Sequence, residues 1–147
     1  MTNFIMSETA YGLYLAGLNY PGAKVCLSGM HPVLMEMATR HAQYQADHKR
    51  QGHQLWSKRV KELETTMGSY RYAEIAAESW GWQKDASKVE LGAEMFKCWE
   101  QSPGHWSVAS KSHTYFGCDM AQSSKGIWYA CIIVADSLDK QDFVEYT

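Results

Sequence analysis

The sequence predicts an α+β protein whose sheet lies between layers of helices. Helical periodicity fills the first two thirds of the chain and strand periodicity fills the last third, which favours an α+β fold. The last predicted strand, residues 126–136, is apolar on both faces and therefore needs a cover on both sides. With 147 residues, of which 46% are hydrophobic and 20% charged, the chain has the composition of one globular domain.

Three helices are predicted in the first half of the chain. Residues 7–20 form a short helix, which the turn at Pro21 stops. Residues 31–52 give the clearest helical pattern, because apolar residues recur every three or four positions after Pro32, a residue suited to a first helical turn. Residues 54–67 carry a second apolar stripe that ends at a glycine.

The middle of the chain is less regular. The segment YRYAEIAAESWGW, residues 70–82, is ambiguous between a short helix and a packed loop. A further helix begins near Asp85 or Ser87, since either side chain can cap a helix N-terminus. Pro103 and the glycine after it are expected to end that helix within the stretch WEQSPGHW.

The last third contains two predicted strands, residues 113–121 and 126–136, joined by a short hairpin loop. If the loop has two or four residues, Cys118 lies opposite Cys131, with Cβ atoms roughly 4.5–5.5 Å apart. Such a pair of adjacent thiols can oxidise to a disulfide with some adjustment. A three-residue loop breaks this register.

Charge and targeting signals narrow the functional classes. The formal net charge of −2 gives no electrostatic footprint for nucleic acid, and no apolar run approaches the roughly 20 residues of a membrane span. The N-terminus lacks the basic region of a signal peptide. We therefore expect a protein that is cytoplasmic at synthesis, with incorporation into a virion or another assembly as an alternative. Residues 1–30 are interpreted as an N-terminal arm or helix that serves as a candidate interaction segment, and residues 31–147 as a single domain.

Several short motifs occur in an order that resembles the CAP superfamily, also called SCP-like domains, which includes cysteine-rich secretory proteins, antigen 5 and pathogenesis-related proteins. The bacterial branch with an SPGH motif is most similar. The matching pieces are His41-Ala42, Gly52-His53, Glu74 to Ala77, the stretch from Trp99 to His105, Phe116-Gly117 and Trp128-Tyr129. The resemblance covers about residues 31–135. It departs from the family pattern at Ile75, where asparagine is usual, and at Trp106, where arginine is usual.

The resemblance implies a three-layer α–β–α sandwich with a small central antiparallel sheet and a cleft that holds two histidines and one or two acids. Carried over by position, the cleft residues are His53, Glu74 and His105. Imidazole and carboxylate groups suit zinc or another divalent cation, so His53 and His105 are the predicted metal ligands. Candidates for a second acid are Glu78, Glu94 and Glu100.

Three functions follow as hypotheses. The first is a CAP-like binding or interaction domain with this cleft. The second is a structural or accessory protein, such as a phage virion component, that keeps the fold without chemistry. The third is a hydrolase that uses the same cleft, with Cys26 as a possible nucleophile, and an enzyme is the less favoured interpretation. Partners would be a protein or a second copy of the chain. Trp80, Trp82 and Trp106 favour a core or cleft wall, with a surface for lipid or glycan as the alternative.

Overall fold

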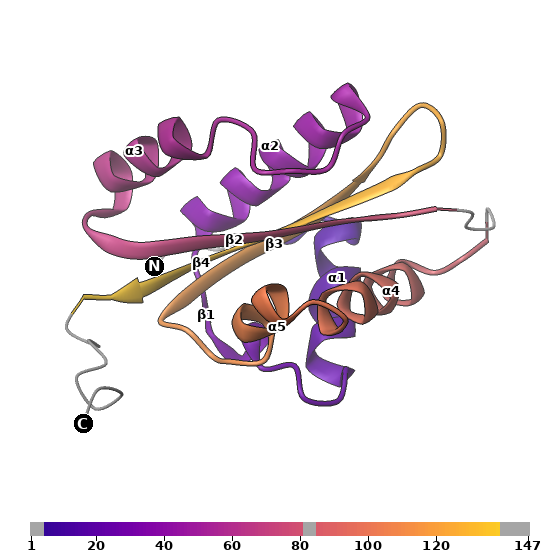
Figure 1. The fold of residues 1–147 in the computed structure, drawn as a ribbon, viewed down its shortest axis with the longest axis horizontal. Coiled ribbons are helices and arrows are strands. Elements are labelled where there is room, and N and C mark those ends of the chain that lie inside the picture. Colours follow the sequence, from indigo (N-terminus) through magenta and orange to yellow (C-terminus); the bar gives the residue numbers. More distant parts are fainter. Residues whose placement is uncertain (1–4, 81–84, 139–147) are drawn as a thin grey trace.

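The computed structural model describes residues 5–80 and 85–138 (Figure 1). Helices and strands are interspersed along the chain. In chain order they are α1 (Glu8–Asn19), a 3₁₀ turn (Val25–Leu27), β1 (Gly29–Met30), α2 (Pro32–His48), α3 (Trp56–Met67), β2 (Tyr70–Ser79), α4 (Lys88–Glu100), α5 (Pro103–Ala109), β3 (Tyr115–Gln122) and β4 (Trp128–Ser137).

The sheet has the strand order β1-β3-β4-β2. β4 lies between β3 and β2 and pairs antiparallel with both, while the two-residue β1 runs parallel to β3. The sheet is therefore antiparallel except for this short edge pair. β2 forms the opposite edge, and among the described strands it pairs with β4 on one side only.

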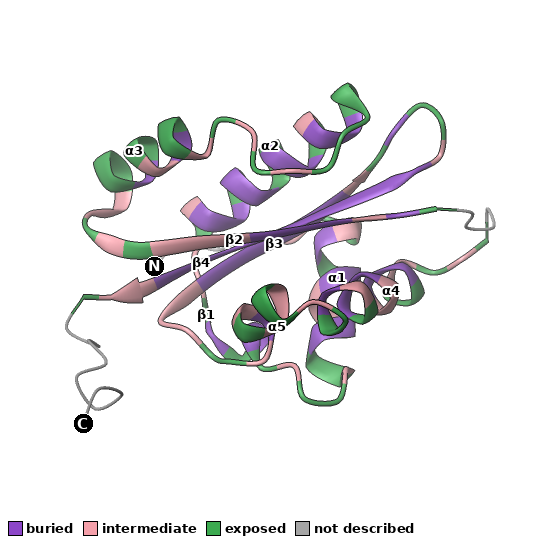
Figure 2. Cartoon of the chain, viewed as in Figure 1, coloured by how far each residue is buried: buried purple, intermediate pink, exposed green. Residues whose placement is uncertain are grey.

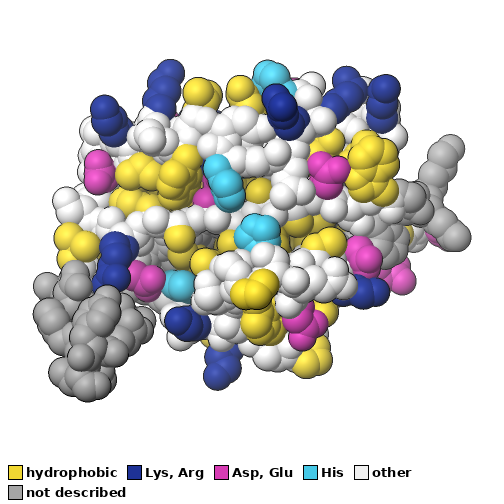
Figure 3. Space-filling view, in the orientation of Figure 1, with side chains coloured by type: hydrophobic (Ala, Val, Ile, Leu, Met, Phe, Trp, Pro, Cys, Tyr) yellow, Lys and Arg dark blue, Asp and Glu magenta, His cyan; other side chains and the backbone are white. Residues whose placement is uncertain are grey.

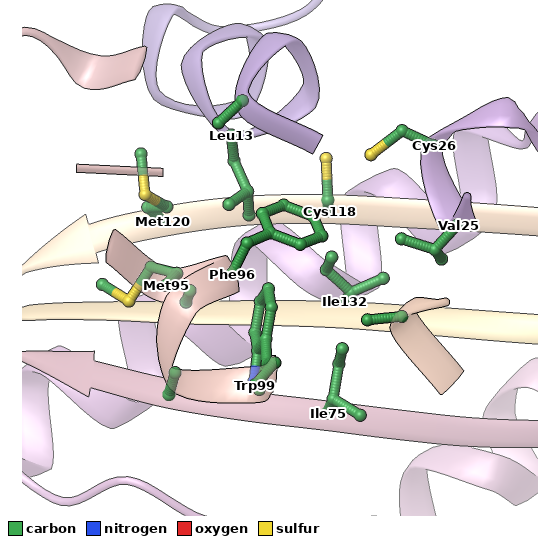
Figure 4. Packing of buried hydrophobic residues seen from close by; sticks show 14 of the residues in the cluster. Leu13, Val25, Cys26, Ile75, Met95, Phe96, Trp99, Cys118, Met120 and Ile132 are labelled. Atoms are coloured by element: carbon green, nitrogen blue, oxygen red, sulfur yellow. The ribbon is translucent and has the colours of Figure 1, made fainter. Parts of the chain in front are cut away.

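Helices cover both faces of the sheet, which makes the fold an α–β–α sandwich, as the doubly apolar β4 requires (Figures 1 and 2). On one side, α2 and α3 pack on the sheet through a cluster that includes Leu34, Leu63 and Ile133. On the other side, α1, α4 and α5 enclose a larger cluster around Phe96 and Trp99 (Figure 4).

The predicted helix at residues 7–20 is confirmed as α1, but it does not stand apart from the rest of the chain. Ser7 caps it by accepting a hydrogen bond from the backbone amide of Ala10 at 3.1 Å. Leu13 and Ala16 are buried in the same cluster as α4 and the sheet. The boundary at residue 30 therefore does not separate two packing units.

Two local predictions were wrong or incomplete. Residues 70–79 form neither a helix nor a loop but the ten-residue strand β2, which pairs with β4 over its whole length. Alanine and glutamate favour helices weakly, and the pairing with a buried neighbouring strand overrides that preference. Pro103 does follow the end of α4, but it also starts α5 as its first residue, where a missing amide hydrogen costs nothing.

The predicted opposition of Cys118 and Cys131 is also wrong. Ser123 and Ile127 bond through their backbones at 2.8 Å, which leaves a three-residue loop in which Gly126 takes a positive φ of 86°. Cys118 consequently pairs with Ile132, and Asp119 pairs with Cys131. The shift of one residue sends the two thiols to opposite faces of the sheet, and both cysteines are free.

Candidate functional site

The two helical layers meet the sheet at the free edge of β2. The carbonyl of Ala76 accepts hydrogen bonds from Gln51 Nε2 at 3.4 Å and from Trp99 Nε1 at 3.0 Å. Two side-chain donors use both lone pairs of this oxygen, so it points away from β4 and toward the free edge. In Figure 3, two histidine side chains lie in the middle of this face, over β2 and between the helical layers.

His53 is held at this edge by Glu74, which lies on β2. The His53 Nδ1 atom lies 2.9 Å from Glu74 Oε1. A carboxylate oxygen can only accept, so Nδ1 carries the hydrogen and Nε2 of the neutral ring keeps its lone pair. The Glu74 side chain is 1% exposed, whereas that of His53 is 49% exposed. The carboxylate thus fixes the orientation of an imidazole whose other nitrogen can bind a ligand.

Glu74 is surrounded by donors. Both terminal nitrogens of Arg59 bind its carboxylate, and the thiol of Cys131 donates to Oε2 at 3.4 Å. Burial alone would raise the pKa of Glu74, but the hydrogen bonds from His53 and Arg59 and the nearby positive charges outweigh burial and lower it. Glu74 therefore stays ionised, and its oxygens are engaged by neighbours. It is placed to orient His53 and not to bind a ligand itself.

A second buried histidine fixes the loop that carries His53. His41 Nε2 donates to the carbonyl of Gly52 at 2.7 Å. The amide of Gly52 donates to Gln45 Oε1 at 3.0 Å, and Gln45 Nε2 donates to the carbonyl of Ala130 at 3.3 Å. These bonds tie the loop to α2 and to the central strand. Burial lowers the pKa of His41, which favours its neutral form.

His105 approaches the same place from the other layer, in the first turn of α5. It lines a cavity of about 260 Å³ together with Gln51, Glu78 and Trp99. Burial lowers the pKa of His105, and His53 lowers it further. No hydrogen bond to the His105 ring is formed within residues 5–80 and 85–138. Its nitrogens are therefore available to a ligand.

The structure pairs His53 with Glu74 on β2, and His105 lines the adjoining cavity, whose wall includes Gln51 and Ala76, each two residues from His53 or Glu74. His53 and Glu74 do not themselves line that cavity. Of the candidate second acids, Glu78 lies on the cleft wall and accepts from Trp80 Nε1 at 2.6 Å. Glu100 instead accepts from Tyr20, away from the two histidines, and Glu94 lies near the same tyrosine. Within the described part of the chain, no group of three or more His, Cys, Asp or Glu side chains could hold a metal ion.

The sequence analysis missed Arg59 as a site residue. It lies on the buried stripe of α3 between Trp56 and Leu63, and its guanidinium lies 5.2 Å from the centre of the Trp56 ring. An arginine on the buried face of an amphipathic helix needs a buried partner, and this position was the signal that could have found the Glu74 ion pair.

The tryptophans were predicted to form either a core or cleft wall or a binding surface, and the two described ones differ in this respect. Trp106 packs edge-on against Tyr20 at 6.2 Å, so it joins the lower helical layer to the turn after α1. Trp80 is 66% exposed at the end of β2, which does not fit a core role. Trp82 lies outside the described residues.

We expect the protein to lose stability as the pH falls below 7. The pKa values of His41 and His105 are lowered from 6.5, so the unfolded chain binds more protons than the folded chain below that pH. Glu74 adds a second loss below 4.5 for the same reason. Urea denaturation at pH 7.5, 5.5 and 4 measures this. His41→Gln, which can still donate to Gly52 but cannot titrate, should reduce the loss between pH 7.5 and 5.5. An equal loss in the variant would contradict the role of His41.

Comparison with known proteins supports the fold alone. No protein-family model and no curated protein sequence matches the chain. The solved structure of an outer surface protein from Borrelia burgdorferi is similar, with a TM-score of 0.62 and 15% sequence identity over 93% of this chain and 99% of that one. Among the described helices, none is long and apolar enough to cross a membrane.

Proposed function

We propose that the chain is a CAP-like binding domain that captures its ligand in the cleft at the free edge of β2. The observation that carries the proposal is the presentation of His53. A buried, ionised carboxylate holds Nδ1 at 2.9 Å, and the ring is half exposed with Nε2 open. His105 lines the adjoining cavity with a lowered pKa, so its ring is suited to bind as a neutral imidazole.

A divalent cation such as zinc is the candidate occupant of this histidine pair. Two imidazoles are fewer than the three protein ligands of a catalytic zinc site, and Arg59 neutralises the nearest carboxylate. The donor set therefore fits a weakly held cation whose coordination is completed by water or by the ligand. Glu74 would act as the group that orients a metal-binding histidine, a role in which carboxylates are common.

Calorimetric titration with zinc tests the histidine pair. We expect His53→Ala and His105→Ala each to weaken zinc binding about tenfold or more. His48→Ala is the matched control, because His48 is an exposed histidine on α2 that bonds to its own helix at Tyr44. Zinc affinity that is the same in all four proteins would contradict the proposal.

The binding role is favoured over a hydrolase. Cys26, the nucleophile considered, is buried in the core cluster of α1 and α4, and burial raises the pKa of its thiol to about 12. The thiol of Cys131 is also buried, and it donates its hydrogen to Glu74. Neither sulfur is placed to attack a ligand in the cleft.

A further inference from the structure

A second cavity, of about 600 Å³, lies beside the first half of β2 and the C-terminal end of α5. Its wall is basic and rich in hydroxyl groups, although the whole chain is weakly acidic. Three cations and three serines line it: Lys24, Arg71, Lys111, Ser107, Ser110 and Ser112. In Figure 3, basic side chains, a histidine and an acidic side chain gather at the lower left of the face that shows β2.

Among the described residues of this wall, the carboxylate of Asp136 is the one acidic group, and it already has hydrogen-bond partners. Asp136 Oδ2 lies 2.8 Å from His113 Nδ1, and Asp136 Oδ1 accepts from the backbone amide of Thr114 at 3.2 Å. The other ring nitrogen of His113 lies 2.9 Å from the carbonyl of Val108. The ring therefore lies between two acceptor groups, the carboxylate of Asp136 and the carbonyl of Val108. Both oxygens of Asp136 thus have partners within the wall.

Two lysines of the wall, Lys24 and Lys111, leave their positive charge available to a ligand. Both side chains are exposed, and neither forms an ion pair with a carboxylate of the described residues. The arginines of the histidine-cleft layer differ, since Arg40 pairs with Glu62 and Arg59 with Glu74. The backbone places the two lysines together, because the amide of Lys24 bonds to the carbonyl of Ala109 at 2.9 Å, two residues before Lys111.

We propose that this cavity is a binding site for a phosphate monoester. The ammonium groups of Lys24 and Lys111 can bind phosphate oxygens through charge-assisted hydrogen bonds, and the hydroxyls of Ser110 and Ser112 can donate to the same oxygens. A volume of about 600 Å³ exceeds what inorganic phosphate needs, so the site has room for the organic group that carries the phosphate. The site is separate from the histidine cleft, because His53 and His105 do not line it.

Amide NMR spectra during titration with glycerol 3-phosphate test this proposal. We expect resonances of residues 107–113 to shift with glycerol 3-phosphate, to shift less with inorganic phosphate, and to stay in place with glycerol. Lys24→Gln combined with Lys111→Gln should weaken binding about tenfold. Lys58→Gln combined with Lys97→Gln is the matched control and should bind as wild type does, because neither residue lines the cavity.

Both lysines are exposed, so the double variant should melt as wild type does, and a thermal melt verifies this before affinities are compared. His53→Ala should also bind glycerol 3-phosphate normally, which separates this site from the histidine cleft. Vesicles of phosphatidylcholine with and without phosphatidic acid show whether a lipid headgroup can supply the monoester as well as a soluble molecule can. The proposal is overturned if residues 107–113 do not respond to glycerol 3-phosphate, or if the folded Lys24/Lys111 double variant binds it as tightly as wild type.

Discussion

Replacing Arg59 by methionine should destabilise the protein by about 3–5 kcal/mol, the cost of removing one partner of a buried ion pair. The side chains of Arg59 and Glu74 are 11% and 1% exposed. Without the guanidinium, the Glu74 carboxylate keeps His53 and Cys131 as its donors among the residues that the structure describes. The variant also loses the bond from Arg59 Nε to the carbonyl of Gln54 at 3.0 Å, which holds the loop before α3.

Arg40→Met is the matched control for this experiment. Arg40 pairs with Glu62 at 2.6 Å, but the two side chains are 53% and 49% exposed, so the loss should stay below about 1 kcal/mol. Urea denaturation of both variants measures the difference. Adding Glu74→Gln to Arg59→Met should recover part of the loss, because it removes the unpaired charge. Equal losses for Arg59→Met and Arg40→Met would show that Glu74 does not depend on Arg59.

Gly117→Ala should cost about 3 kcal/mol through steric overlap alone. A Cβ atom at this position of β3 would lie 2.2 Å from the carbonyl carbon of Leu34 and 2.3 Å from the amide nitrogen of Met35. Both atoms belong to the backbone of the first turn of α2, so no side-chain rotation can relieve the contact. The helix would have to move away from the sheet.

Gly104→Ala serves as the control for this steric effect. A Cβ atom on Gly104, in the first turn of α5, would meet no atom within 4 Å. Alanine there should leave stability unchanged or raise it by up to about 1 kcal/mol, because it limits the unfolded chain. Urea denaturation of the two variants compares them directly. A Gly117→Ala protein within about 0.5 kcal/mol of wild type would mean that α2 does not sit as close to β3 as described.

The sandwich could be predicted because the sequence of β4 by itself indicates that both faces of the sheet are covered. Residues 128–135 are apolar on both faces, and only cover on both sides can bury them. The strand β2 was not predictable in the same way. Its Ala- and Glu-rich sequence suits a helix, and its strand form depends on pairing with β4, which lies about fifty residues later. The predicted cysteine register was wrong because the hairpin loop has one additional residue, Gly126. That residue shifts the pairing of β3 with β4 by one position, so that the predicted partners lie on opposite faces of the sheet.

The candidate site shows the same division. A resemblance in motif order pointed to His53, Glu74 and His105, which lie in the loop before α3, in β2 and in α5. It could not show that Arg59 binds Glu74, because that pair depends on how α3 packs over β2. This contact changes the chemistry proposed for the cleft. Because Arg59 and His53 occupy the Glu74 carboxylate, the groups left to bind a ligand are the imidazoles of His53 and His105.

Imidazole ¹H–¹⁵N NMR spectra at pH 8, recorded with and without zinc, test most directly whether His53 and His105 form one binding pair that Glu74 orients. We predict that His53 carries its hydrogen on Nδ1, that zinc shifts the resonances of His53 and His105 together, and that His48 does not respond. Glu74→Gln should weaken the tautomer preference of His53 while leaving His105 unchanged. A His53 ring with its hydrogen on Nε2, or a response to zinc from only one of the two histidines, would contradict this account of the cleft.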